Sequence, residues 1–160
     1  GHSGYPPAMP ILLRPVLESD LPILYEQQLD PEGTAMAAFP SRDKNAFMAH
    51  WAKIMANDSN ILKTIVCDSH VAGHIGSWEM DGHREVGYWI GKEFWGKGIA
   101  TQALTEFLEI VKTRPLFAHV AKHNVASKRV LEKNGFNVIG KDSYNNSAGM
   151  LVDEFVLKLE

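Results

Sequence analysis

Apolar residues in this chain fall into short alternating or continuous runs, a pattern typical of β-strands. The runs predict seven strands, at residues 11–17, 61–67, 71–79, 85–90, 115–120, 137–140 and 151–159. Pro15 lies inside the first run. Because proline cannot donate to a strand ladder, this run is expected at a sheet edge or at a bulge.

Four other segments show the three-to-four-residue spacing of amphipathic helices. These helices are expected at residues 21–29, about 41–58, 99–112 and 124–134. We expect Ser19 and Asp20 to cap the first helix, the run 31–33 (Pro-Glu-Gly) to break it, and Gly135 to end the last one.

The resulting order of elements is β-α-α-β-β-β-α-β-α-β-β, with a meander in the middle and crossovers near the end. This is not the regular alternation of a doubly wound nucleotide fold. The expected fold class is therefore α/β (α+β): a mixed, mostly antiparallel sheet of six to seven strands flanked by about four helices. We expect a single domain over residues 11–160. The first ten residues, which begin Gly-His-Ser rather than with Met, are expected to be a cloning remnant or disordered.

Composition narrows the class of protein without identifying a function. The chain has 160 residues, of which 45% are hydrophobic, enough for one domain with a sizeable core. The net charge of −3 argues against a general nucleic-acid binder, and no apolar run has the length of a membrane span. The one cysteine, Cys67, lies in an apolar run and is expected to be a buried strand residue rather than a nucleophile. A cytoplasmic protein is the simplest expectation.

The stretch G-K-E-F-W-G-K-G-I-A-T at residues 91–101 matches the beginnings of three anion-binding motifs. A P-loop would need Ser or Thr after Lys97, where Gly98 stands. A dinucleotide-binding turn would need Gly or Ala where Thr101 stands. The third motif, a glycine turn opening a helix, fits best, since Gly96 and Gly98 allow close backbone approach and a helix N-terminus attracts anions.

Two longer runs make the interpretation specific. They are E-V-G-Y-W-I-G-K-E-F-W-G-K-G-I-A-T-Q-A-L at 85–104 and N-V-A-S-K-R-V-L-E-K-N-G-F at 124–136. Together they resemble the GCN5-related N-acetyltransferase (GNAT) superfamily, and within it the branch of ribosomal-protein N-terminal alanine acetyltransferases. The resemblance covers nearly all of residues 11–159. One departure is Trp95, which stands where the superfamily usually has Gln or Arg.

The resemblance implies acetyl transfer from acetyl-CoA to a primary amine, either a protein N-terminus or a small amine. No metal and no covalent enzyme intermediate are expected. The residues expected to contact the cofactor are Trp89, Ile90, Trp95, Gly96, Lys97, Gly98, Ile99, Ala100, Thr101, Asn124 and Ser127. The N–H of Ile90 is expected to face the acetyl carbonyl. The alternative interpretation is a non-catalytic module of the same fold that binds or senses CoA.

Two proton-transfer roles need candidates. Glu85 begins the strand before the glycine turn and is the candidate base or water-relay acceptor. Many relatives have a Tyr seven residues after the Asn of the second motif, as the acid for the CoA thiolate, but Leu131 occupies that position here. Ser127 is the candidate substitute and Tyr144 a weaker one, and the thiolate could also leave without a proton from the protein.

The acceptor site is less readable from motifs. Trp78, Tyr88 and Tyr144 are the candidate acceptor contacts, and residues 19–58 and 141–150 are expected to shape the site. His119 and His123 have H-x-x-x-H spacing, but across a strand end and a loop, so no metal site is expected. No nucleic acid or membrane partner is expected, and the sequence does not indicate an oligomeric state.

Overall fold

A computed structural model describes residues 10–160. The expectation for the first nine residues therefore lies outside the described part. Seven strands form one sheet in the order β1-β2-β3-β4-β5-β7-β6. Their bounds are β1 Ile11–Pro15, β2 Ile61–Cys67, β3 His70–Met80, β4 His83–Ile90, β5 Leu116–Ala121, β6 Asn137–Asn145 and β7 Leu151–Leu159. Neighbouring strands are antiparallel except β4 and β5, so the expected mixed, mostly antiparallel sheet is confirmed.

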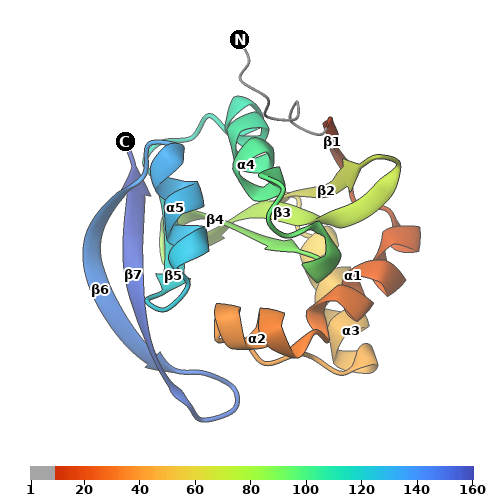
Figure 1. The fold of residues 1–160 in the computed structure, drawn as a ribbon, viewed down its shortest axis with the longest axis horizontal. Coiled ribbons are helices and arrows are strands. Elements are labelled where there is room, and N and C mark those ends of the chain that lie inside the picture. The colour runs from red at the N-terminus through yellow and green to blue at the C-terminus, as the bar shows by residue number, and fades with distance from the viewer. Residues whose placement is uncertain (1–9) are drawn as a thin grey trace.

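Five α-helices cover the two faces of the sheet (Figure 1). They are α1 Leu21–Gln28, α2 Pro31–Ala37, α3 Lys44–Met55, α4 Ile99–Ile110 and α5 Val125–Lys133, with short 3₁₀ turns η1 Glu18–Asp20 and η2 Lys92–Phe94. Helices α4 and α5 lie on one face, and α1 and α3 pack on the other. No helix within residues 10–160 is both long enough and apolar enough to cross a membrane.

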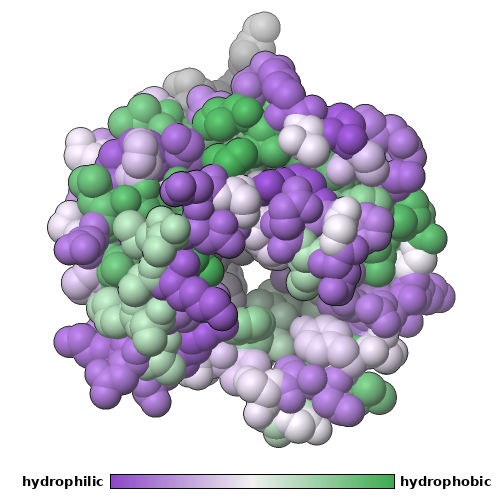
Figure 2. All heavy atoms as spheres, turned by 180° about the vertical axis from the view of Figure 1, so that it is seen from behind, coloured by the Kyte–Doolittle hydropathy of each residue, from purple (hydrophilic) through white to green (hydrophobic). Residues whose placement is uncertain are grey.

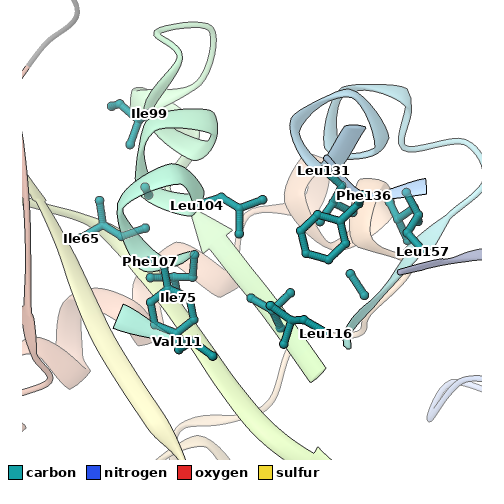
Figure 3. Packing of buried hydrophobic residues seen from close by; sticks show 14 of the residues in the cluster. Ile65, Ile75, Ile99, Leu104, Phe107, Val111, Leu116, Leu131, Phe136 and Leu157 are labelled. Atoms are coloured by element: carbon teal, nitrogen blue, oxygen red, sulfur yellow. The ribbon is translucent and has the colours of Figure 1, made fainter. Parts of the chain in front are cut away.

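The larger core lies between the sheet and α4 (Figure 3). Leu104 and Phe107 of α4 are fully buried, as are Ile65 of β2 and Ile75 of β3. Ile99 at the start of α4 is also buried, which fixes the first turn of this helix against the protein. Since burying each such side chain contributes about 1.5–3 kcal/mol, α4 is a rigid platform for whatever its N-terminus binds.

Three predictions about the elements were wrong. The run 31–33 does not only end the first helix: Pro31 starts a new helix, α2, whose N-cap Asp30 accepts hydrogen bonds from the backbone N–H groups of Glu32 and Gly33. Asp20 makes no cap bond to α1. Its buried carboxylate instead pairs with Arg14 at 2.7 Å. Strand β6, expected over residues 137–140, continues to Asn145, so only the second half of the segment 141–150 is a loop.

Helix α2 is tied to the C-terminal half of the chain by two side chains. His123, just before α5, bonds the carbonyl of Ala35 through Nε2 at 2.8 Å. Asn146, in the β6–β7 loop, donates to the carbonyl of Ala38 at 3.2 Å. These bonds hold α2 across the end of the sheet where β4 and β5 separate (Figure 1).

Candidate active site

Strands β4 and β5 separate after a short contact. They pair only at Arg84 with Leu116 and at Glu85 with Phe117. β4 then continues to Ile90 without a partner strand on that side within the described residues. Backbone N–H and C=O groups need hydrogen-bond partners, so this unpaired edge of β4 is suited to an extended ligand.

The register shows which groups face the gap. The N–H of Gly91 donates to the carbonyl of Ala72, toward β3, at 2.8 Å. Alternate residues of an antiparallel strand direct their backbone groups toward the same neighbour. Tyr88 and Ile90 therefore direct their backbone groups away from β3 and into the gap.

Two adjoining cavities occupy the gap, with volumes of about 400 Å³ and 130 Å³. Both are lined by Ala37, Tyr88, Asn124 and Ser127, and we call them together the cleft. Figure 2 shows a hollow near the centre of the opposite face, at the place that α2, α5, β4 and β5 surround in Figure 1. The cleft is therefore open to a ligand on this face of the molecule.

The glycine turn forms one end of the larger cavity. Gly96 and Gly98 both have φ of +74°, a left-handed conformation that favours glycine, and nothing lies within 4 Å of where a Cβ would stand. Gly98 is the N-cap of α4 and offers no side chain, so the first N–H groups of α4 lack a capping partner. A turn of this kind at a helix N-terminus is suited to a phosphate.

Most of the expected cofactor contacts come together here. Those that line the larger cavity are Trp89, Ile90, Trp95, Gly96, Gly98, Ile99, Ala100, Thr101, Asn124 and Ser127. Lys97 is the exception: its ammonium lies 5.9 Å from the centre of the Phe94 ring and does not line the cavity. An extended strand edge, a free helix N-terminus and an apolar wall suit a ligand with a peptide-like arm and phosphates, as coenzyme A has.

Asn124 and Ser127 share the start of α5, as their spacing predicts. Asn124 caps this helix by accepting from the N–H of Ser127 at 3.1 Å. The Ser127 hydroxyl lies 2.7 Å from the Tyr88 hydroxyl. Burial raises the pKa of Tyr88 to about 12, so this phenol keeps its proton. Leu131 is buried in the core and also lines the smaller cavity. The pairing of Ser127 with Tyr88 had no signal in the sequence, because the two residues come from distant elements.

Glu85 does not line the cleft itself. Its buried carboxylate lies 3.1 Å from Nε2 of His119, and the other ring nitrogen lies 2.8 Å from Glu154. The hydrogen bond with Glu85 is the main cause that raises the pKa of His119 to about 9, while Glu154 adds to it and burial opposes it. His119 is thus an imidazolium at neutral pH, and it is His119 that faces the smaller cavity.

No motif in the sequence connects Glu85, His119 and Glu154. They come from β4, β5 and β7, and only the strand order places them side by side. Asp142 of β6 completes a group in which His119, Asp142 and Glu154 could offer metal ligands within 4.8 Å of one another. Both nitrogens of His119 already bond carboxylates, so the arrangement is explained as an ion-pair network.

The three candidate acceptor contacts lie in different places. Tyr88 lines both cavities, whereas Trp78 and Tyr144 line neither. Trp78 packs across Gly87, where a Cβ would stand 2.8 Å from its ring. Tyr144 lies on β6 with more than a third of its surface exposed. The partial burial of its phenol, together with the charge of Glu154, raises the pKa of Tyr144.

Splayed strands, a glycine turn and a helix N-terminus define a class of protein that holds an extended, phosphate-bearing ligand. The family model described as "Acetyltransferase (GNAT) domain" matches residues 11–137. The chain therefore belongs to the GNAT acetyltransferase family, whose acyl donor is acetyl-CoA, and the resemblance stated from the sequence is confirmed.

Similar solved structures support the fold, and the names of the similar proteins refer to different acceptors. The chain is 30% identical over 105 residues to a Bacillus subtilis (strain 168) protein named "Putative ribosomal N-acetyltransferase YdaF", a match covering 61% of this chain and 57% of that protein. Spermidine N-acetyltransferase from Vibrio cholerae, solved with CoA and spermine, has a TM-score of 0.80 at 17% identity, covering 93% and 94% of the two chains. Ribosomal-protein-alanine N-acetyltransferase from Brucella melitensis has a TM-score of 0.77 at 21% identity, covering 92% and 98%.

Proposed function

We propose that this protein is an acetyl-CoA-dependent N-acetyltransferase that moves the acetyl group directly to a primary amine. One observation carries the proposal: the unpaired edge of β4 at Ile90 and the N-terminus of α4 meet in one cavity of the cleft, and the second cavity adjoins it. Such a cleft lets two substrates meet end to end, and bringing them together supplies much of the rate.

Acetyl-CoA supplies a thioester. The amine nitrogen attacks its carbonyl carbon, the C–S bond breaks, and CoA leaves as a thiolate. The backbone of β4 at Tyr88 and Ile90 is suited to hold the pantetheine arm, and the first turn of α4 the pyrophosphate. The N–H of Ile90 faces the gap, where it can stabilise negative charge on the carbonyl oxygen.

The network of Glu85, His119 and Glu154 lies on the acceptor side of the cleft. An acceptor amine arrives as an ammonium ion and must lose a proton before it attacks. With two carboxylates and one imidazolium, the network has a net negative charge that attracts this cation. We assign Glu85 as the final proton acceptor, which the proton reaches from the cleft through water.

Ser127 is the proposed donor to the leaving thiolate. Tyr88 keeps its proton and can donate to Ser127 Oγ, which leaves the Ser127 proton free for the sulfur. This pair supplies the hydroxyl that Leu131 cannot. It therefore favours an enzyme over the alternative, a CoA-binding module without activity.

Two acceptor classes fit a primary-amine site: the N-terminal amine of a protein and a small polyamine. We propose the protein N-terminus, because the relative with the higher sequence identity carries a ribosomal name. The test is mass spectrometry of acceptors incubated with acetyl-CoA: peptides with N-terminal Ala, Ser or Met, and separately spermidine and spermine. Acetylated peptides support the proposal, acetylated polyamines alone would replace the acceptor class, and no acetylated product would contradict the activity.

A further inference from the structure

Trp95 contacts the strand that it follows. Its indole Nε1 donates a hydrogen bond of 2.9 Å to the carbonyl oxygen of Ile90, five residues earlier. The intervening residues form the 3₁₀ turn η2, which closes with backbone bonds from Phe94 to Gly91 and from Trp95 to Lys92. The indole therefore joins the end of β4 to the start of the glycine turn.

The glycine turn has little else to hold it. Gly96 and Gly98 have no side chains and face open space, and the Lys97 side chain extends outward to Phe94. Glycine is the residue type that loses most conformational entropy when it is ordered. A side chain that anchors the turn before Gly96 reduces the number of arrangements the free turn can adopt.

The same bond acts on the Ile90 backbone. The carbonyl of Ile90 has no partner strand in the gap, and the indole N–H supplies the missing donor. The carbonyl of Ile90 shares one peptide plane with the N–H of Gly91, which donates to the carbonyl of Ala72. Both polar groups of this plane are therefore bonded, so the backbone at Ile90 cannot rotate freely.

We propose that Trp95 is a positioning residue whose indole N–H holds the Ile90 backbone and the glycine turn ready for acetyl-CoA. The inference rests on the proposed function. It gives Trp95 a role of its own at a position where the family usually has a Gln or Arg side chain: here the side chain braces the protein rather than contacting the ligand through a charge or an amide.

The test compares wild type, Trp95→Phe and Trp95→Gln. Phenylalanine keeps an aromatic ring but has no donor, whereas glutamine has a donor N–H and no ring. Because one hydrogen bond of this kind is worth a few-fold to tenfold in an equilibrium, Trp95→Phe should raise the Kd for acetyl-CoA and lower kcat, each about 3- to 10-fold. Trp95→Gln should recover part of both losses. The thermal midpoint of the apo protein should stay within a few degrees of wild type.

The second readout is the carbonyl ¹³C chemical shift of Ile90 in the apo protein, measured by NMR. Loss of the indole donor should move this resonance in Trp95→Phe and move it back in part in Trp95→Gln. An unmoved Ile90 resonance, or unchanged Kd and kcat in Trp95→Phe, would overturn the inference. If wild type does not bind acetyl-CoA, the proposed function is wrong. The ¹³C shift of the Ile90 carbonyl then still shows whether the indole N–H of Trp95 holds the Ile90 backbone.

Discussion

His119 lines the smaller cavity of the cleft and lies between two buried carboxylates, so its charge affects the stability of the fold. The pKa of its imidazole is about 9 in the folded protein and about 6.5 in an unfolded chain. Because the folded pKa is the higher one, the ion pairs stabilise the protein fully below about pH 6.5. This stabilisation is lost as pH rises through about 9.

We therefore expect the unfolding free energy of wild type to fall between pH 6.5 and 9, by about 1 kcal/mol from this residue, because solvent screens an imidazole that is partly exposed. His119→Gln should be less stable at pH 6.5, because it leaves Glu85 and Glu154 without the cation, and its stability should change less over this range. Urea unfolding at several pH values measures both slopes. Equal slopes in the two proteins would show that His119 is not charged in the way described.

Glu85 gives a second prediction at the residue scale. Glu85→Gln keeps the shape of the side chain but removes its charge, so we expect kcat to fall at least tenfold while the Kd for acetyl-CoA changes less than twofold. Glu79→Gln is the matched control, since Glu79 is an exposed carboxylate on β3 paired with Arg84. Unaltered turnover in Glu85→Gln would remove this residue from the mechanism.

At the scale of elements, local sequence predicted what depends on local contacts. The glycine turn, helix α4 and the Asn124 cap follow from spacing within a few residues, and all three are present. Helix α2 was missed because Pro31 and Gly33 are read as breakers, although proline is well suited to the first position of a helix. Gly33 is needed there for another reason: a Cβ would stand 3.0 Å from the Trp89 ring, a contact between distant segments.

The glycine turn itself can be tested against a matched site. Gly98→Ala forces a side chain onto a φ of +74°, at a cost of about 1 kcal/mol, and places a methyl group at the cleft. Gly82→Ala imposes similar strain at φ of +80° in the β3–β4 turn, also in open space. We expect both variants to lose similar stability by thermal unfolding, and only Gly98→Ala to weaken acetyl-CoA binding, by calorimetry. Equal Kd values in the two variants would contradict the role of the turn.

For the whole molecule, the strand order determines the site. Glu85, His119 and Glu154 are up to 69 residues apart, from 85 to 154, and become neighbours because β4, β5 and β7 are adjacent in the sheet. The periodicity of the sequence predicts the strands but not the order of the strands in the sheet. Glu85 could therefore be predicted as a site residue, whereas its pairing with His119 could not. The same limit explains Ser127, whose partner Tyr88 lies on β4.

The central claim is that two substrates meet in the cleft and react directly. Its most direct test is the initial rate of free thiol release from acetyl-CoA, with peptide or polyamine acceptor varied at several fixed acetyl-CoA concentrations. The account predicts release that requires the amine, saturates in both substrates and gives intersecting lines in double-reciprocal plots, as a ternary complex does. No release with any amine, or parallel lines that indicate an acetylated enzyme intermediate, would contradict it.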